Sequence, residues 1–262
     1  MKILLIGDIV GKGGRKAVCK LVPELRKEFN CCFCIANAEN IAGGSGLTHK
    51  CVASLNRAGV DVVTSGDHVW RQKEFIQNIN RLPYVLRPAN FHADQPGKGF
   101  GIFNIPIGGV VCVISLLGRI FLQHHGDNPF TAVEQILDRV SHQAKIIFVD
   151  FHCEATSEKV AMGRFLDGRV TAVFGTHTHV QTADEQIFPG RTAYISDIGM
   201  VGGRDSIIGR DIGAVLKSFT VGMPAHYKVI EKNIVLHGAV VEFNPEDGTA
   251  LGIERIEREF EQ

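Results

Sequence analysis

The chain opens with the stretch Met1-Lys2-Ile3-Leu4-Leu5-Ile6-Gly7-Asp8, in which a short apolar run ends at a glycine and an acid. The run suits a buried β-strand and is too short for a signal peptide or for the roughly 20 apolar residues of a membrane span. Similar runs recur at residues 31–36 and 60–64. Segments with helical spacing lie between them, so the pattern predicts parallel strands linked by helices.

Helices are predicted at residues 15–29 and 48–58. In the first, apolar residues recur at the spacings of one helix face, and Pro23 predicts a kink or a restart of the helix; in the second, Thr48 is a good N-cap. The remaining predictions are an antiparallel hairpin of residues 99–105 and 110–116, helices at 129–144 and from about 155, strands at 146–149, 170–174 and 192–196, and a β-meander over 227–256. The expected architecture is α/β, with two β-sheets and helices outside them.

The composition indicates a globular protein. The chain has 262 residues, of which 45% are hydrophobic and 21% charged, and 28 Lys and Arg residues balance 28 Asp and Glu residues. We expect a single domain over residues 1–262, with no strong nucleic-acid signature, because a zero net charge lacks the positive field that polyanion binding needs. Seven cysteines, an odd number, favour a reduced, cytoplasmic protein. No membrane partner is expected, and a homo-oligomer is left open.

Polar residues stand just after five of the predicted strands. The carboxyl ends of strands in an open parallel sheet share one edge, where ligands bind, so these side chains should meet in one crevice. They are Asp8, Glu39, Asn40, Asp67, His68, His152, His177 and His179.

These residue types predict a dinuclear metal site. Carboxylates and an Asn oxygen mixed with imidazoles suit iron, manganese or zinc, and the lack of a thiolate argues against a structural zinc site. His177 and His179 are two residues apart, so on an extended segment both rings would point the same way. Three carboxylates this close would raise one another's pKa unless cations lay between them.

Simpler interpretations apply to individual residues. A single Asp or His after a strand is more often a helix cap, although eight such coincidences are hard to explain in that way. Asp150 and Glu154 flank His152, and we expect them to orient the ligating imidazoles. The loop pair His124-His125 could line a substrate cleft. The glycine-rich residues 7–14 fail the dinucleotide-binding and P-loop patterns, so they predict a tight turn near a bound anion.

The polar residues lie in five short sequence blocks that together resemble the pattern of a known family. They are Gly7-Asp8, Asn37-Ala38-Glu39-Asn40, Gly66-Asp67-His68, Asp150-Phe151-His152-Cys153-Glu154 and Gly175-Thr176-His177-Thr178-His179. This set resembles the YmdB family of calcineurin-like metallophosphoesterases, from residue 1 to about residue 220.

The resemblance implies a four-layer α/β/β/α metallophosphoesterase sandwich with mixed sheets. It also implies two divalent or trivalent transition-metal ions, iron foremost and manganese or zinc as alternatives, that hydrolyse phosphodiesters such as 2′,3′-cyclic nucleotides or cAMP. Position by position, one ion would be held by Asp8, Glu39, Asn40 and His179, and the other by Glu39, Asp67, His152 and His177. A metal-bound hydroxide would be the nucleophile and His68 the general acid.

One position departs from the family pattern, which has Asn where this chain has Asp67. One more negative charge would therefore face the metal ions, with a weaker field on the substrate or a changed metal preference as the consequence. Two other functions stay open from the sequence: a weakly active or non-hydrolytic regulatory protein that binds metal and nucleotide, and an iron-dependent redox enzyme.

Overall fold

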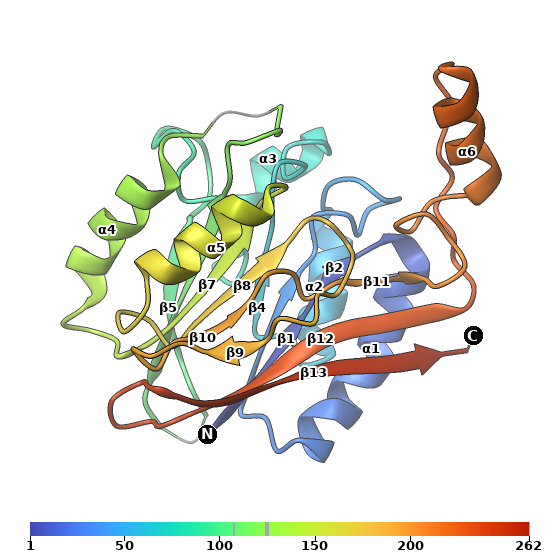
Figure 1. Cartoon of the computed structure of the whole chain (residues 1–262). Helices are drawn as coiled ribbons and strands as arrows, with labels where there is room; N and C mark the ends of the chain where they lie inside the picture. The colour runs from blue at the N-terminus through green and yellow to red at the C-terminus, as the bar shows by residue number, and fades with distance from the viewer. Residues whose placement is uncertain (107, 124–125, 262) are drawn as a thin grey trace.

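The computed structural model describes residues 1–106, 108–123 and 126–261. Within these ranges the fold is mixed α/β, with two β-sheets and six α-helices (Figure 1). The pair His124-His125, a candidate for the substrate cleft, lies outside the described residues. None of the helices in these ranges is long and apolar enough to cross a membrane.

The strands and helices alternate as the sequence predicts, with a few additional short elements. In chain order they are β1 (Lys2–Ile6), β2 (Asp8–Ile9), α1 (Gly11–Glu28), β3 (Phe33–Asn37), α2 (His49–Arg57), β4 (Val62–Thr64), α3 (Lys73–Asn78), the 3₁₀ helix η1 (Ile79–Arg81), β5 (Phe100–Asn104), β6 (Val110–Leu117), α4 (Pro129–Val140), β7 (Ile146–His152), α5 (Thr156–Phe165), β8 (Ala172–Thr176), β9 (Gln186–Ile187), β10 (Ala193–Ile195), β11 (Met200–Gly203), α6 (Ile212–Val221), β12 (Ile234–Phe243) and β13 (Ala250–Phe260).

The first sheet has seven strands, in the order β2-β11-β12-β1-β3-β4, with β13 paired to β12. The neighbours β1, β3 and β4 are parallel, as the alternating pattern predicts. The C-terminal strand β12 pairs antiparallel with β1 and with β13, so the end of the chain completes the sheet that its first residues begin. The predicted meander is confirmed for β12 and β13, but residues 227–230 contribute only an isolated bridge at Val229.

The second sheet has six strands, in the order β5-β6-β7-β8-β10-β9. The predicted hairpin is confirmed, because β5 and β6 pair antiparallel from Phe100 opposite Ile114 to Asn104 opposite Val110. The strands β6, β7, β8 and β10 run parallel. The hairpin strand β5 therefore adds an antiparallel strand at one edge of a mostly parallel second sheet.

Apolar side chains form three buried clusters that hold these elements together. One cluster joins the facing sides of the two sheets, for example Leu5 and Ile35 of the first sheet and Phe148 of the second. The other two pack helices onto the outer sides: α1 and α2 against the first sheet, and α4 and α5 against the second (Figure 1). Parallel strands buried on both faces read as continuous apolar runs, which is what the sequence shows at each of these strands.

Helix α1 bears on two predictions. Pro23 lies inside the helix, so the helix does not restart there, and the kink stays a prediction. The residues Gly11, Gly13 and Gly14 form the first turn of α1 and not the expected tight turn. A Cβ at Gly14 would lie 2.1 Å from the carbonyl oxygen of Val201, so the glycines allow α1 to pack closely against β11.

We predict that Gly14→Ala destabilises the protein by about 1–3 kcal/mol, because the added methyl group overlaps backbone that cannot move away cheaply. The matched control is Gly213→Ala in α6, where the nearest atom to the new Cβ would be 3.5 Å away. There the better helix propensity of Ala should leave stability unchanged or raise it by up to about 1 kcal/mol. Urea unfolding of both variants measures the difference, and equal midpoints would contradict the close-packing explanation.

Candidate metal centre

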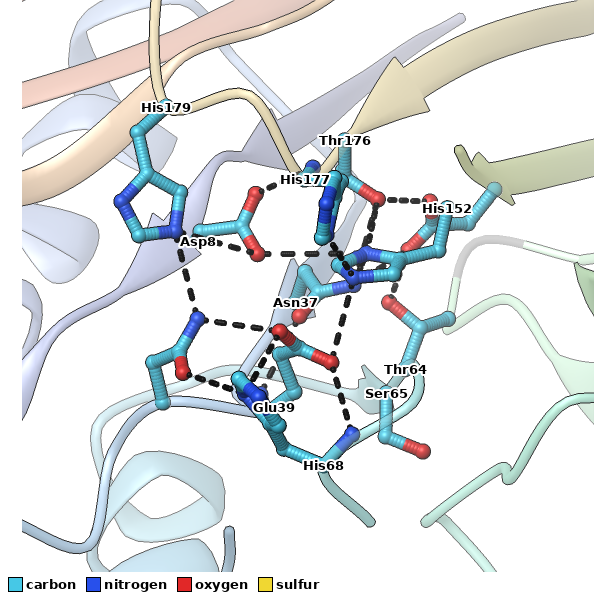
Figure 2. Close-up of polar contacts among 12 residues, drawn as sticks. Asp8, Asn37, Glu39, Thr64, Ser65, His68, His152, Thr176, His177 and His179 are labelled. Carbon is cyan, nitrogen blue, oxygen red and sulfur yellow. Dashed lines mark hydrogen bonds and ion pairs between the residues drawn. The ribbon is translucent and has the colours of Figure 1, made fainter. Parts of the chain in front are cut away.

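The eight polar residues singled out in the sequence lie together at the carboxyl ends of the strands. Asp8 begins β2, Glu39 and Asn40 follow β3, and Asp67 and His68 follow β4 in the first sheet. The second sheet contributes His152, the last residue of β7, and His177 and His179 after β8. Figure 2 shows side chains from both sheets pointing toward one another, among them the labelled Asp8, Glu39, His152 and His179. The centre therefore lies across the two sheets and belongs to neither alone.

One half of the centre consists of Glu39, Asp67, His152 and His177. One ligand-type atom from each of these residues lies within 4.8 Å of all the others. The Nε2 atom of His152 is 3.1 Å from a Glu39 oxygen and 3.5 Å from Oδ1 of Asp67. The Nδ1 atom of His177 is 3.0 Å from the same His152 nitrogen. This set offers two nitrogen and two carboxylate ligands to one ion, which suits zinc, manganese or iron.

The other half consists of Asp8, Asn40 and His179, with Glu39 between the two halves. The Nε2 atom of His179 lies 3.9 Å from Oδ1 of Asp8 and 3.2 Å from Nδ2 of Asn40. The Asn40 amide nitrogen donates to Oε1 of Glu39 at 3.0 Å, and its oxygen faces Nδ1 of His68 at 3.0 Å. Asn40 therefore lies where a ligand is expected but turns its nitrogen, not its oxygen, toward Glu39 and His179.

The neighbours of His152 determine which of its ring nitrogens faces the centre. Its Nδ1 atom lies 2.8 Å from the hydroxyl of Thr176, which donates its own proton to Asp150 at 2.7 Å. His152 must therefore donate from Nδ1, so Nε2 is the nitrogen that faces Glu39 and Asp67. Asp150 thus orients His152 through Thr176, not by direct contact.

The two other imidazoles are oriented in the same way. His179 donates from Nδ1 to the carbonyl oxygen of Ile208 at 3.0 Å, so its Nε2 lone pair faces Asp8. His177 places Nε2 3.2 Å from a carboxylate oxygen of Glu154, so its Nδ1 lone pair faces the centre. Hydrogen bonds of this kind, from the far nitrogen to a carbonyl or carboxylate, are typical of metal-binding histidines.

The charges in the centre shift the pKa values of its members in opposite directions. Burial raises the pKa of Asp8 to about 6, although the charges of His179 and His152 oppose it. Burial also acts to raise the pKa of Glu39, but the charge and hydrogen bond of His152 lower it well below its usual range. Burial, together with the charge of His152, lowers the pKa of His177 to about 4. Burial acts to lower the pKa of His152, but the charge of Glu39 and the hydrogen bonds of Asp67 and Glu39 raise it well above its usual value, so this imidazole can carry a proton that balances part of the negative charge.

Two buried carboxylate oxygen atoms indicate that metal ions fit between these residues. Oδ1 of Asp8 and Oδ1 of Asp67 are buried and have no hydrogen-bond partner, although both face the imidazole nitrogens of the centre. A buried carboxylate oxygen without a partner is costly unless a cation neutralises it. Each of the two oxygens lies in a different half of the centre, so the residues present fit an ion in each half.

The loop that carries His177 and His179 is strained and braced. Both residues have positive φ angles, 100° and 66°, so the expectation of an extended segment is wrong. Between them, Thr178 donates its backbone N–H and its hydroxyl to Asp197, at 3.0 and 2.8 Å. Asp197 is in turn paired with Lys159 of α5 at 2.7 Å, and both are almost completely buried. The strain directs the two rings into different halves of the centre.

The polar residues that brace the centre could not be found from the sequence. Thr176, Asn37 and Thr64 all donate hydrogen bonds to the buried Asp150, and Lys159 and Asp197 hold the histidine loop. The only signal in the sequence was polar residues at the ends of apolar strands, which also suits ordinary turns. A Lys in a helix gives no indication that it is buried until the partner strand is known.

Comparisons with known proteins place the chain in a family. The family model of YmdB-like proteins matches residues 4–256. The chain is 44% identical to the 2′,3′-cyclic-nucleotide 2′-phosphodiesterase of Bacillus subtilis (strain 168), over 98% of this chain and 96% of that protein. A solved structure of a novel phosphatase from Mycoplasma pneumoniae has 32% identity and a TM-score of 0.92, covering 100% of this chain and 94% of that one. A hypothetical protein from Thermus thermophilus has 36% identity and a TM-score of 0.91, covering 99% of both chains. Because the family model covers residues 4–256 and the Bacillus subtilis relative is 44% identical over 98% of the chain, the chain belongs to the family of YmdB-like proteins.

Proposed function

We propose that this protein is a metal-dependent phosphoric diester hydrolase with two metal ions, acting on cyclic nucleotides such as 2′,3′-cyclic nucleotides or cAMP. The observation that carries the proposal is the pair of partnerless buried oxygens, Asp8 Oδ1 and Asp67 Oδ1, one in each half of the centre. The name of the Bacillus subtilis relative supports the substrate class. Iron is the preferred metal, with manganese or zinc as alternatives, because all three accept mixed nitrogen and oxygen ligands.

The ligands of the proposed centre are divided into two sets that share Glu39. Asp8, Glu39, Asn40 and His179 would hold one ion, and Glu39, Asp67, His152 and His177 the other. When bound, such ions lower the pKa of a water molecule and neutralise charge on phosphate oxygens. Asn40 would bind through its oxygen after a half-turn of its amide group, and the protonated Nδ1 of His68 would then donate to the Glu39 carboxylate, 3.3 Å away.

His68 is the proposed general acid. Its ring is partly exposed and lies beside the centre, with Nδ1 3.0 Å from Asn40 and 3.3 Å from Glu39. Burial acts to lower its pKa, but the hydrogen bond and charge of Glu39 raise it above its usual value. A raised pKa keeps the imidazole protonated near neutral pH, and the partly exposed edge can reach the departing oxygen of a substrate.

We further propose that residues 1–262 form one metallophosphoesterase domain of the four-layer α/β/β/α type. The apolar cluster between the two sheets and the helix layers outside them support this arrangement. The seven free cysteines of the described chain support a cytoplasmic location. A regulatory protein that binds metal without hydrolysis and an iron redox enzyme remain the rival functions, and the experiment below separates them.

The first test compares the wild type with His68→Gln. The wild type should contain about two transition-metal ions per chain and hydrolyse both 2′,3′-cyclic AMP and bis-p-nitrophenyl phosphate. His68→Gln should keep its metal ions and lose about 10²- to 10⁴-fold in rate on the cyclic nucleotide, whose alkoxide leaving group needs a proton. The loss on the nitrophenyl ester should be much smaller, because p-nitrophenolate leaves without one.

Elemental analysis and initial rates on both substrates are the measurements, and His142→Gln, at an exposed position, is the control. Metal ions without hydrolysis of either substrate would favour the regulatory function, and redox activity without hydrolysis would favour the oxidoreductase. Fewer than one ion per chain under metal-replete conditions would refute the dinuclear centre. Equal losses on both substrates with depleted metal would make His68 a ligand and not the acid.

The second test concerns the charge of Asp67. Asp and Asn both offer a ligating oxygen, but Asp adds one negative charge beside His152 and His177. We predict that Asp67→Asn keeps the fold, binds metal ions more weakly and turns over faster when loaded, because the ions then exert a stronger field on the phosphate. Metal titration and kcat at saturating metal check this. Identical metal preference, pH profile and rate in both proteins would show that the charge is irrelevant.

The third test concerns Thr178, which holds the histidine loop through Asp197. We predict that Thr178→Val, which removes the hydroxyl but keeps the size, weakens metal binding by about 10- to 100-fold. The readout is titration of metal-free protein with Co²⁺, followed by its visible spectrum, and Thr178→Ser should restore the affinity. The matched control is Thr192→Val, a buried residue just before β10 whose hydroxyl donates to Val170. Equal Co²⁺ affinity in Thr178→Val and wild type would contradict a bracing role.

A further inference from the structure

A cavity of about 550 Å³ lies beside helix α4, away from the ligands of the metal centre. Its wall consists of one face of α4 with the two residues before the helix, the loop of residues 87–93, and Phe100 at the start of β5. Among the described residues that line it, none belongs to the metal centre. Cavities of about 300–1000 Å³ are typical of small-molecule sites in proteins. We call this space the α4 cavity.

A buried positive charge lies in the wall of the α4 cavity. Arg87 is only 5% exposed, and it lines the cavity. Its guanidinium group donates four hydrogen bonds of 2.8–3.5 Å to carbonyl oxygens of its own loop, those of Pro88, His92, Gln95 and Pro96. Within the described parts of the chain, Arg87 forms no ion pair. Burial without an anion beside it lowers the pKa of Arg87.

The carbonyl bonds of Arg87 explain only part of its environment. A structural role, in which Arg87 holds the loop of residues 88–96 in shape, accounts for these four bonds. A guanidinium group has five N–H donors, so one hydrogen, on Nη1, remains for another partner. A buried charge without a counter-charge is costly, and an anion in the α4 cavity would remove that cost.

A second positive charge lines the same cavity from the side of the helix. Arg139 lies in the last turn of α4, and its side chain has no hydrogen-bond or ion-pair partner among the described residues. Asn128, Thr131 and Gln135 also line the cavity, and they precede Arg139 at intervals of three or four residues. That spacing places the four side chains on one face of α4. This face therefore offers one cation and three polar groups to a ligand.

The rest of the lining is apolar, apart from one acid. Phe91 and Ile136 are buried and Phe100 is half-buried, so their side chains offer a partly aromatic surface to a flat ring. Asp127 is the acid among the described lining residues. It is exposed, so water screens its charge, and its carboxylate can accept hydrogen bonds from hydroxyl groups.

The α4 cavity is formed before any ligand arrives. Asn90, which is 2% exposed, accepts from the backbone N–H of Leu117 and donates to the carbonyl oxygens of Leu117 and Asp127, each at 2.9 Å. The backbone N–H of Asp127 donates to the carbonyl oxygen of Asn90 at 2.7 Å. These bonds tie the loop of residues 87–93 to the end of β6 and to the segment before α4. A preformed site loses little conformational entropy when it binds a ligand.

We propose that the α4 cavity binds a nucleoside monophosphate. The phosphate group would contact Arg87 and Arg139, because guanidinium groups bind phosphate oxygens with strong, charge-assisted hydrogen bonds. The base would pack against Phe100 and the apolar part of the wall, and the sugar hydroxyls would donate to Asp127. A free phosphate ion would leave the apolar wall uncovered, and a nucleoside would leave the charge of Arg87 without an anion. The proposal does not depend on the proposed function, since no ligand of the metal centre takes part.

The experiment is isothermal titration of the full-length, metal-loaded protein with adenosine 5′-monophosphate (AMP). The wild type should bind AMP saturably, and it should bind adenosine and inorganic phosphate each more weakly than AMP. Arg139→Gln should weaken AMP binding by about 10- to 100-fold, because one charged contact to phosphate is lost. Ala132→Trp should weaken it at least as much, because the larger side chain fills the cavity without a change of charge. The matched control is Arg57→Gln, in the last turn of α2, which should bind AMP like the wild type.

Circular dichroism and metal analysis of each variant verify that the fold and the metal centre are unchanged. Equal AMP affinity in the wild type, Arg139→Gln and Ala132→Trp would overturn the proposal, because AMP would then bind elsewhere, as at the metal centre. Lack of saturable AMP binding to the wild type would overturn it too. Inorganic phosphate that binds as tightly as AMP, and is lost in Arg139→Gln, would make the cavity a phosphate site and refute the nucleotide. None of these readouts requires hydrolysis, so a failure of the proposed function would be seen separately.

Discussion

The close approach of three carboxylates, two buried and one largely buried, is the constraint on which the rest of this structure depends. Asp8 begins β2, Glu39 and Asp67 lie in the loops after β3 and β4, and the three side chains converge where little water can screen their charges. Histidines from the second sheet face them and offset part of this charge. At this edge the two sheets are therefore held together by the attraction between carboxylates and imidazoles. Away from the edge they are held together by the apolar cluster between their facing sides.

The surroundings of the centre orient its ligands before any ion arrives. Each of the three imidazoles uses its outer nitrogen for a fixed partner, namely Thr176, Glu154 or the carbonyl of Ile208, and so presents its inner nitrogen to the carboxylates. The histidine loop has an unfavourable backbone conformation, which a buried lysine and aspartate stabilise from behind. Rigid placement of this kind lowers the entropic cost of ligand binding, and it explains why polar residues outside the centre are as deeply buried as its members.

Several features could be predicted from the sequence because they depend on local pattern. Alternating apolar runs and helical spacings indicated the parallel strands, and the turn at Gly108-Gly109 indicated the β5–β6 hairpin. The ligand candidates followed from a general property of parallel sheets, that strand ends share an edge. The prediction was wrong where packing overrides the local pattern. The glycines at positions 11, 13 and 14 form the first turn of α1 and allow its close packing, where the local pattern indicated a tight turn.

The sequence by itself determined which residues could meet at the strand ends and what chemistry they offer, because residue type and strand order are local properties. Only the tertiary structure decided how they meet. The conformation of His177 and His179, the orientation of Asn40 and the bracing by Lys159 and Asp197 depend on contacts between segments distant in the chain. The same holds for α6, in which the fold buries Val215 and leaves the other large apolar side chains exposed. Burial is a property of the assembled molecule, so no single segment can reveal it.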